Sequence, residues 1–369
     1  MFWKKTPPMP NALAPEVLLA TLDTVIDPHL GVGLNIAGCV KAIYPGAVPR
    51  IEVELGFPAA GLRASLVAQV QAAVRAAHGV ECGVEVSWLI QPQTQTRNVA
   101  PHAGIKNIIA IASGKGGVGK STVAANFALA LVAEGARVGL LDADIYGPSQ
   151  PQMMGVGQAK PELISERSMR PVMAHGVQLM SIGFLIAEDQ PMIWRGPMAT
   201  QALNQLLNET AWDALDYLIL DLPPGTGDIQ LSIAQKMPVA GAVIVTTPQD
   251  VALLDAKKGL QMFHKVGVPV LGVVENMAMY CCPNCGHEAA VFGSGGGAKL
   301  AAQSGTEVLG ALPLQLSIRE QADAGVPSVV AEPDGDIAAR YRAIARLATA
   351  RLAHGDAAAG AAFPSIEIV

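Results

Sequence analysis

The sequence SGKGGVGKST occupies residues 113–122. It satisfies the pattern G-x-x-x-x-G-K-[ST], and it lies between an apolar run from Ile108 to Ala112 and a helix-like segment from about Ser121 to Glu134. A buried strand, a glycine-rich loop and a helix in this order are typical of a phosphate-binding loop. The stretch therefore predicts an α/β domain with a nucleotide site after its first strand.

Each residue type in this loop suits contact with phosphate. The glycines let backbone N–H groups converge on phosphate oxygens at a helix N-terminus, Lys120 supplies positive charge to the β and γ phosphates, and the Ser121 hydroxyl can bind Mg²⁺. The second lysine, Lys115, is either a solvated loop charge or an ammonium group that needs an anion nearby. We expect the nucleotide contacts to come from Gly114, Lys115, Gly116, Gly117, Val118, Gly119, Lys120, Ser121 and Thr122.

Two acidic segments follow later apolar runs. They read LDADIYGPS at residues 141–149 and LDLPPGTGD at residues 220–228. Asp221 ends its run where a carboxylate would hold Mg²⁺ through water, and Gly225 lets the backbone approach a γ phosphate. Asp228 is equally well explained as a helix cap. The sequence has no N-K-x-D motif for guanine, so the expected nucleotide is ATP.

The rest of the chain predicts two domains. Beyond residue 105, continuous apolar runs alternate with helical segments, which is typical of a doubly wound, mostly parallel sheet in an α/β P-loop domain. These runs are Ile108 to Ala112, Val138 to Leu141, Leu218 to Leu220, Ala242 to Val245 and Val270 to Val274. Residues 1–90 show the order helix, strands, helix, strand and predict a small α+β domain.

The domain limits follow from these patterns. We expect a polar linker at residues 91–104 and the larger domain at residues 105–353, with a last helix from about Asp336 to Leu352. The Ala/Gly-rich residues 354–369 are expected to form a flexible tail.

The composition limits the function classes. Of the 369 residues, 51% are apolar and 15% are charged, which excludes intrinsic disorder for most of the chain. The net charge of -6 gives no electrostatic footprint for nucleic acid or an anionic membrane. The N-terminus lacks the apolar core of a secretory signal, and no apolar run approaches the roughly 20 residues that span a bilayer. We therefore expect a cytoplasmic protein without nucleic-acid or membrane partners.

Three of the five cysteines cluster in YCCPNCGH at residues 280–287. A C-x-x-C turn such as Cys282 to Cys285 brings two thiolates to one soft metal centre. A zinc site closed by Cys281 and His287 and a redox dithiol are both open interpretations. The remaining two cysteines lie in strand-like apolar surroundings and are expected to be buried; they are Cys39 and Cys82.

With these segments in view, the chain resembles the Mrp/ApbC family of iron-sulfur cluster carriers, a deviant Walker-A class of P-loop ATPases that also includes MinD, ParA and nitrogenase iron protein. The matching segments are GKGGVGKS, LLDADIYGPS, WRGPM at residues 194–198, DLPPGTGD, VENM at residues 274–277 and the CPNC that follows. The resemblance covers about residues 105–350. The first 90 residues resemble the MIP18-like domain often fused ahead of it, but GFPAAG at residues 56–61 lacks the cysteine of that family's T-P-x-C-P turn.

The resemblance implies roles for individual residues. Lys115 would reach across a dimer to the partner's nucleotide, Asp144 would be the switch carboxylate near the attacking water, and Asn276 would contact adenine. Lys115, Lys120 and Asp144 are the expected catalytic residues. Ser121 and Asp221 are the expected Mg²⁺ ligands.

The resemblance also assigns the cysteines. Cys282 and Cys285 match the family's bridging pair, and a two-fold dimer would bring four such thiolates together, as [4Fe-4S] ligation requires. The role of Cys281 stays open. The predicted function is a homodimeric, slowly hydrolysing ATPase that binds a labile [4Fe-4S] cluster and passes it to apo-proteins. The alternatives are a MinD/ParA-like positioning or partition ATPase and a ligase or kinase for a small substrate.

Overall fold

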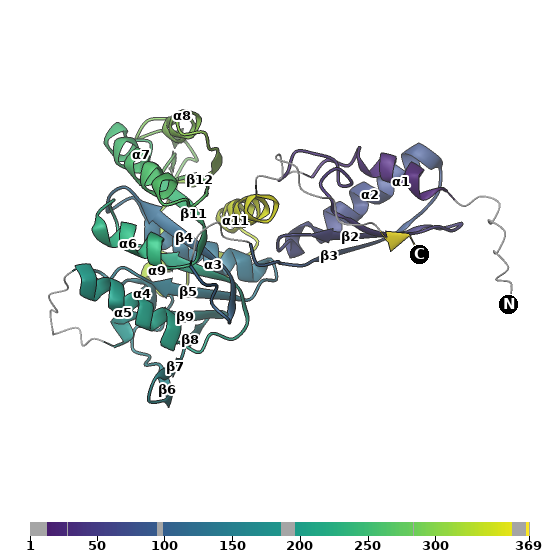
Figure 1. The fold of residues 1–369 in the computed structure, drawn as a ribbon. Coiled ribbons are helices and arrows are strands. Elements are labelled where there is room, and N and C mark those ends of the chain that lie inside the picture. Colours follow the sequence, from purple (N-terminus) through teal and green to yellow (C-terminus); the bar gives the residue numbers. More distant parts are fainter. Residues whose placement is uncertain are drawn as a thin grey trace. The chain divides into compact units, whose positions relative to one another are not determined.

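The computed structural model describes residues 13–27, 29–93, 99–185, 196–282, 284–355 and 367–368. The chain divides into two compact units, one from residues 1–91 with 349–369 and one from residues 92–348 (Figure 1). We propose that the domain limits expected at residues 90, 104 and 353 separate parts of the chain that fold independently. Most of the expected tail, part of the expected linker and the first two residues of WRGPM lie outside the described residues.

The first unit is a four-stranded sheet with its helices. The strand order is β16-β1-β2-β3, with β1 and β2 antiparallel and the other pairs parallel. Its elements are α1 (Pro15–Leu22), β1 (Val40–Tyr44), β2 (Arg50–Leu55), η1 (Ala60–Leu62), α2 (Arg63–His78), β3 (Gly83–Trp88) and β16 (Glu367–Ile368). The predicted order of helix, strands, helix and strand is confirmed.

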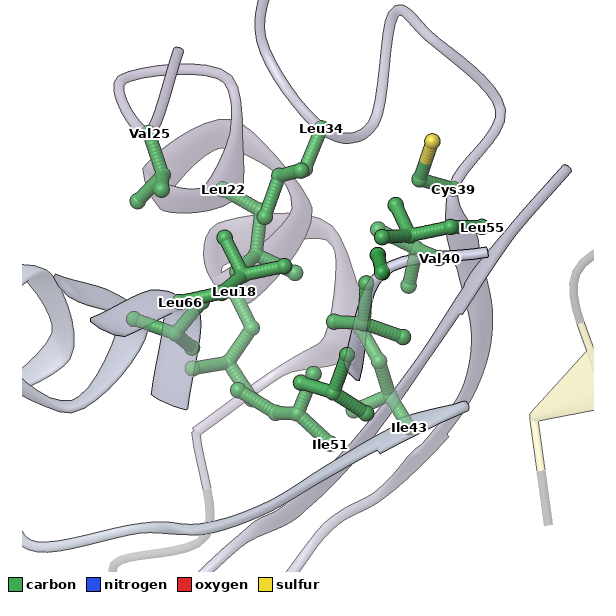
Figure 2. Close-up of a cluster of buried hydrophobic side chains, with 14 of the residues drawn as sticks. Leu18, Leu22, Val25, Leu34, Cys39, Val40, Ile43, Ile51, Leu55 and Leu66 are labelled. Atoms are coloured by element: carbon green, nitrogen blue, oxygen red, sulfur yellow. The ribbon is translucent and has the colours of Figure 1, made fainter. Parts of the chain in front are cut away.

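The alternating pattern of β2 explains the core of this unit. Ile51, Val53 and Leu55 are buried while the residues between them are more exposed, as expected for a half-buried strand. Figure 2 shows Ile51 and Leu55 of β2 in one closely packed cluster with Leu18 and Leu22 of α1. Apolar side chains from both layers therefore stabilise the unit.

Cys39 and Cys82 belong to the same core and are 2% and 4% exposed. Burial and the charge of Asp27 raise the pKa of the Cys39 thiol to about 12. The predicted burial of both cysteines is confirmed, and neither side chain is available to a ligand at neutral pH.

The second unit is built on an eight-stranded sheet of order β15-β12-β11-β4-β10-β5-β9-β8, in which every pair is parallel except the antiparallel pair of β8 with β9. The chain leaves the central β4 toward β5 and β9, returns to β10, and continues outward on the other side through β11, β12 and β15. The predicted doubly wound, mostly parallel sheet is confirmed. The strands are β4 (Ile105–Ser113), β5 (Val138–Asp142), β8 (Val172–Ala174), β9 (Val177–Ser181), β10 (Leu215–Asp221), β11 (Val239–Thr246), β12 (Val270–Glu275) and β15 (Val308–Ala311).

All five apolar runs quoted from the sequence lie within strands of this sheet. Every residue of β5, β10 and β11 is buried, as expected where helices cover a parallel sheet. The sequence patterns missed β8, β9 and β15, because these strands have only three to five residues each. Such short runs carry little periodicity of their own.

Helices and two small hairpins complete this unit. The helix α3 packs on β4, β5 and β10, and α7 packs on β4, β11 and β12. The helical elements are α3 (Lys120–Ala133), α4 (Gln150–Met153), η2 (Ile182–Phe184), α5 (Gly196–Glu209), α6 (Asp228–Lys236), α7 (Asp250–Lys265), α8 (Gly296–Gln303), α9 (Leu316–Asp323), α10 (Ser328–Ala331) and α11 (Asp336–His354), of which residues 336–348 belong to this unit. The hairpins pair β6 (Glu162–Ser165) with β7 (Ser168–Arg170) and β13 (Tyr280–Cys281) with β14 (Glu288–Ala289).

The predicted last helix exists as α11, and its apolar side chains Ile337, Tyr341 and Ile344 are buried. Arg346 donates to the fully buried carboxylate of Glu134 at the end of α3, at 2.5 Å. These contacts hold α11 against the P-loop helix. Within the described part of the chain, no helix is both long enough and apolar enough to cross a membrane.

Candidate functional site

The carboxyl ends of the parallel strands bring polar side chains to one edge of the sheet. In an open α/β sheet this edge is where ligands bind. Asp221 of β10 lies in register with Asp142 of β5 on one side and with Ile111 of β4 on the other. The strands end in buried polar residues: Ser113, Asp142, Ser181, Asp221, Thr246 and Glu275.

The loop between β4 and α3 is held in a shape that only glycine permits at two positions. Gly119 has φ +81°, and a Cβ built on it would lie 2.3 Å from Nδ2 of Asn276. A Cβ on Gly114 would lie 2.1 Å from the carbonyl carbon of Asp255 in α7. Gly114 and Gly119 are therefore required for close packing as well as for approach to a phosphate.

Asn276 fixes the same loop from the end of β12. It is 8% exposed, and its Nδ2 donates to the backbone O of Val118 at 2.8 Å. The family resemblance predicts that Asn276 contacts adenine, and this role stays a proposal. The structure adds a second role, because the side chain holds the phosphate loop in place.

Lys120 lies at the centre of the site with 6% of its surface exposed. Its ammonium group forms a short ion pair with Asp221, which is fully buried, and donates to Oγ of Ser121 at 3.1 Å. A buried carboxylate needs a partner of opposite charge. The structure thus brings together the three residues expected to bind phosphate and Mg²⁺.

Asp142 and Asp144 lie on the neighbouring strand end and loop. Asp142 accepts hydrogen bonds from the backbone of Ser149 at 3.0 Å and from the hydroxyl of Ser181 at 3.1 Å. Burial and the charge of Asp221 raise the pKa of Asp142 to about 7. Burial also raises the pKa of Asp144 above its ordinary value, against the opposing charge of Lys120.

The remaining predicted residues border this cluster. Lys115 is half-buried, and its ammonium group has no hydrogen bond or ion pair with the described residues. The backbone N–H of Gly225 donates to the carbonyl of Ser113 at 2.9 Å, which ties the LDLPPGTGD segment to the phosphate loop. Asp228 is an exposed residue in the first turn of α6, a place where a carboxylate favours the helix dipole.

These residues fit Mg²⁺ and a nucleotide phosphate. Oxygen donors from Ser121 and Asp221 suit a hard cation, and the lysine between them suits phosphate. One buried acceptor in this corner, Oε1 of Gln150, has no hydrogen-bond partner among the described residues. In a ligand-binding site, some hydrogen bonds form only when the ligand is bound. The residue types and the unpartnered oxygen of this corner fit such a site.

The sequence patterns missed Gln150 and Ser181. Both are fully buried polar residues in the site. Gln150 directly follows the quoted LDADIYGPS segment, so extending that motif by one residue would have found it. Ser181 gave no comparable signal, because it ends the short strand β9 that the patterns did not predict.

The cysteine hairpin has a different character. Cys281 ends β13, Cys282 follows it, and the hairpin closes with hydrogen bonds from the N–H of Cys282 to the carbonyl of His287 and from the N–H of Gly286 to the carbonyl of Cys282, both at 2.9 Å. Cys282 is partly exposed and Cys285 is exposed. Both thiols of the C-x-x-C pair are thus accessible from outside the chain.

The turn also conditions the thiol of Cys282. The backbone N–H groups of Asn284 and Cys285 hydrogen-bond to it and lower its pKa. A thiolate is the form that binds iron or zinc. Across the described residues, no three His, Cys, Asp or Glu side chains are gathered as a metal site.

Comparison with known families identifies the larger unit. Residues 104–348 match the ParA family model described as NUBPL iron-transfer P-loop NTPase. The chain belongs to this family. Residues 15–87 match the family model described as iron-sulfur cluster assembly protein, so the resemblance of both parts is confirmed.

The sequences of two relatives are similar to most of this chain. The iron-sulfur cluster carrier protein of Pseudomonas fragi is 59% identical over 71% of this chain and 92% of that protein. The iron-sulfur cluster carrier protein of Haemophilus influenzae is 49% identical over 88% of each chain. The second alignment includes most of the small unit as well as the P-loop unit.

Solved structures of P-loop NTPases share the fold. A nucleotide-binding protein from Archaeoglobus fulgidus in complex with ADP is 38% identical, with a TM-score of 0.55 over 63% of this chain and 90% of that one. The cell division ATPase MinD of Pyrococcus furiosus is 23% identical, with a TM-score of 0.50 over 65% of this chain and 97% of that one. The likeness to MinD shows the fold alone.

Proposed function

We propose that this chain is an ATP-binding, slowly hydrolysing iron-sulfur cluster carrier. It would hold a labile [4Fe-4S] cluster between two copies of the chain and deliver it to apo-proteins. The observation that carries the proposal is the combination of a buried P-loop site with an accessible C-x-x-C thiol pair on one chain. The relatives named iron-sulfur cluster carrier proteins support the same cargo.

The nucleotide side of the proposal assigns a role to each polar group. Lys120 would neutralise the β and γ phosphates, and Ser121 with Asp221 would hold Mg²⁺, which supplies charge neutralisation at the phosphates when bound. Asp144 would orient the attacking water, and burial raises the pKa of its carboxyl above the ordinary value, which makes it a better proton acceptor. Asn276 would contact adenine with the part of its amide that Val118 does not use.

The cluster is the cargo, and Cys282 with Cys285 would provide half of its ligands. Two thiols cannot complete the four-thiolate set that a [4Fe-4S] cluster requires, and a second copy related by two-fold symmetry supplies the other two. A cluster held at such an edge is accessible to acceptor proteins. Accessibility suits delivery better than long-term electron transfer.

Nucleotide state would control the geometry of the dimer and therefore cluster retention. Slow hydrolysis fits this use, because a carrier needs timing rather than flux. The dimer is supported by Lys115, a half-buried residue whose ammonium group lacks a partner among the described side chains and would be available to a second copy's nucleotide. The proposed location is the cytoplasm, with apo-proteins as clients and no nucleic-acid or membrane partner.

The positioning or partition ATPase is the weaker candidate. It would use a basic amphipathic C-terminal helix or a basic DNA-facing patch. In the structure the apolar side of α11 is buried, and Arg342 and Arg346 both face the carboxylate of Glu134. The cysteine hairpin also has no use in that function.

Anaerobic reconstitution with iron and sulfide tests the proposal. We expect the wild-type protein to bind about two irons per chain, one cluster per dimer, with visible absorbance that the double variant Cys282→Ala with Cys285→Ala lacks. Cys82→Ala is the matched control, because it removes a thiol that lies in the core of the small unit. Equal iron and sulfide contents in the wild type and the double variant would refute the cluster assignment.

A further inference from the structure

Gln150 is a buried polar side chain in the nucleotide site. It is the first residue of α4 and is 0% exposed. Burying an amide costs free energy unless its donors and its acceptor find partners. The surroundings of Gln150 therefore indicate what its side chain does.

The NH₂ group of Gln150 joins two segments of the site. It donates to Oδ2 of Asp221 at 2.7 Å and to the backbone O of Ser121 at 2.9 Å. A carboxylate and a carbonyl both accept hydrogen bonds, so only the NH₂ group can face these two atoms. This chemistry fixes the orientation of the amide, with Oε1 on the other side.

The backbone of Gln150 adds a third connection. Its N–H donates to Oδ2 of Asp142 at 3.1 Å. One residue thus joins the start of the P-loop helix and the carboxylates at the ends of β5 and β10. The carboxylate of Asp221 is held between this amide and the ammonium group of Lys120.

The acceptor Oε1 of Gln150 has no donor among the described residues, although it is buried. An unpaired buried acceptor is rare in folded proteins and indicates a partner that comes with a ligand. The same amide contacts Ser121 and Asp221, the two residues suited to Mg²⁺. Mg²⁺ keeps several waters when a protein binds it, and each of these waters is a donor.

We propose that Gln150 is a positioning residue for the magnesium ion of the nucleotide complex. Its NH₂ group orients the Asp221 carboxylate, and its Oε1 accepts a hydrogen bond from a water that the ion retains. This inference rests on the ATP-binding function proposed above and deepens it, because it places part of the magnesium shell on α4, outside the phosphate loop.

Equilibrium binding of a fluorescent ADP analogue to the full chain, titrated with Mg²⁺ from an EDTA-buffered start, tests the proposal. Gln150→Met keeps the length of the side chain and removes both polar groups. We expect the half-saturating Mg²⁺ concentration to rise about tenfold, while affinity for the analogue in EDTA stays within about twofold of the wild type. Gln152→Met is the matched control, since Gln152 is an exposed residue of the same short helix.

Gln150→Glu separates the two polar groups, because it keeps an acceptor at Oε1 and loses the NH₂ donor. The orienting donor to Asp221 is lost, while the acceptor and an added negative charge still favour Mg²⁺, so we expect its half-saturating Mg²⁺ concentration to rise by no more than about threefold. A tenfold rise in this variant would overturn the acceptor role. This outcome can be measured even if the Met variant does not fold.

The outcomes separate this inference from the proposed function. An unchanged Mg²⁺ dependence in Gln150→Met, or a loss of affinity that is equal with and without Mg²⁺, overturns the positioning role alone. A wild-type protein that binds no adenine nucleotide under either condition overturns the proposed function and this inference with it.

Discussion

The phosphate loop and the cysteine hairpin both follow strands of the same sheet and both turn through glycines with positive φ, yet they differ in how completely one chain determines them. The loop residue Lys120 is almost fully buried and paired with Asp221. In the hairpin, Cys285 and the residues around it are exposed and held by two backbone hydrogen bonds. Asn276, at the end of β12, contacts the loop and begins the segment that leads to the hairpin.

The difference concerns where each site obtains its missing partners. The loop has its carboxylate, hydroxyl and amide groups already in place, so a nucleotide meets a preorganised site in a single chain. The hairpin offers two thiols and leaves the rest of a ligand set to another molecule. Substitution of the buried Lys120 should therefore change binding within one chain, whereas substitution of the hairpin thiols should change the ligand set that two chains share.

The largest effect should come from Lys120→Ala. Removing this ammonium group eliminates the charge that faces phosphate and leaves the buried carboxylate of Asp221 unpaired. We expect nucleotide affinity to fall by at least about a hundredfold, while iron and sulfide binding after reconstitution stays near the wild-type level. Fluorescence titration with an ADP analogue measures the first quantity and iron analysis the second.

The exposed Lys299→Ala is the control for Lys120→Ala. Wild-type nucleotide affinity in a folded Lys120→Ala protein would contradict the description of the loop. Loss of cluster binding in that variant without nucleotide would contradict the assignment of the cluster ligands to the hairpin alone.

Two glycine substitutions compare the regions directly. Gly119→Ala would place a Cβ 2.3 Å from the amide of Asn276 at φ +81°, whereas Gly286→Ala has the same type of backbone, φ +72°, with no atom within 4 Å. We expect Gly119→Ala to lower the free energy of unfolding by about 2 to 4 kcal/mol and Gly286→Ala by about 1 kcal/mol. Urea unfolding of both variants measures this, and equal losses would show that the two turns are equally constrained.

Lys115→Ala should have a smaller effect, and only where two chains meet. The half-buried lysine has no partner in the described part of its own chain. We expect nucleotide affinity within about threefold of the wild type, together with about a tenfold weaker ATP-dependent dimerisation. Analytical ultracentrifugation with and without ATP measures dimerisation, and wild-type hydrolysis together with wild-type dimerisation would refute the role across the dimer.

The smallest effect concerns the thiol of Cys282, whose pKa is lowered by the N–H groups of Asn284 and Cys285. A lower pKa means more thiolate at neutral pH, so alkylation by iodoacetamide should be a few-fold faster than for glutathione at pH 7. This difference in alkylation rate should disappear above about pH 9, where both thiols are ionised. Peptide mass spectrometry of the metal-free protein measures the rates, with the buried Cys39 as an unreactive control. A pH profile identical to that of glutathione would contradict the hydrogen bonds.

The sequence predicted the regular parts of the fold because each has a strong local cause. The continuous apolar runs of β4, β5, β10, β11 and β12 are typical of strands buried on both faces, and the alternation in β2 is typical of a half-buried strand. The short strands β8, β9 and β15 escaped prediction because the neighbouring strands, and not their own sequences, make them strands.

The candidate site shows the same division. The glycines, Lys120 and Ser121 were found because their spacing is itself the chemistry of phosphate binding. Gln150 and Ser181 were not found, because their importance depends on lying beside Asp221 and Asp142, which are distant in sequence. A single polar residue has no pattern that distinguishes a site from a surface.

The sequence by itself determined that this chain has a phosphate loop in an α/β domain, a small α+β unit before it and a C-x-x-C thiol pair, since each of these is written in consecutive residues. Only the tertiary structure decided which groups meet. It paired Lys120 with Asp221, turned Asn276 toward the loop, and left one oxygen of Gln150 without a donor. The reason is physical: local spacing fixes backbone conformation, whereas burial, charge pairing and unsatisfied hydrogen bonds depend on strands that are far apart in sequence and adjacent only in the folded sheet.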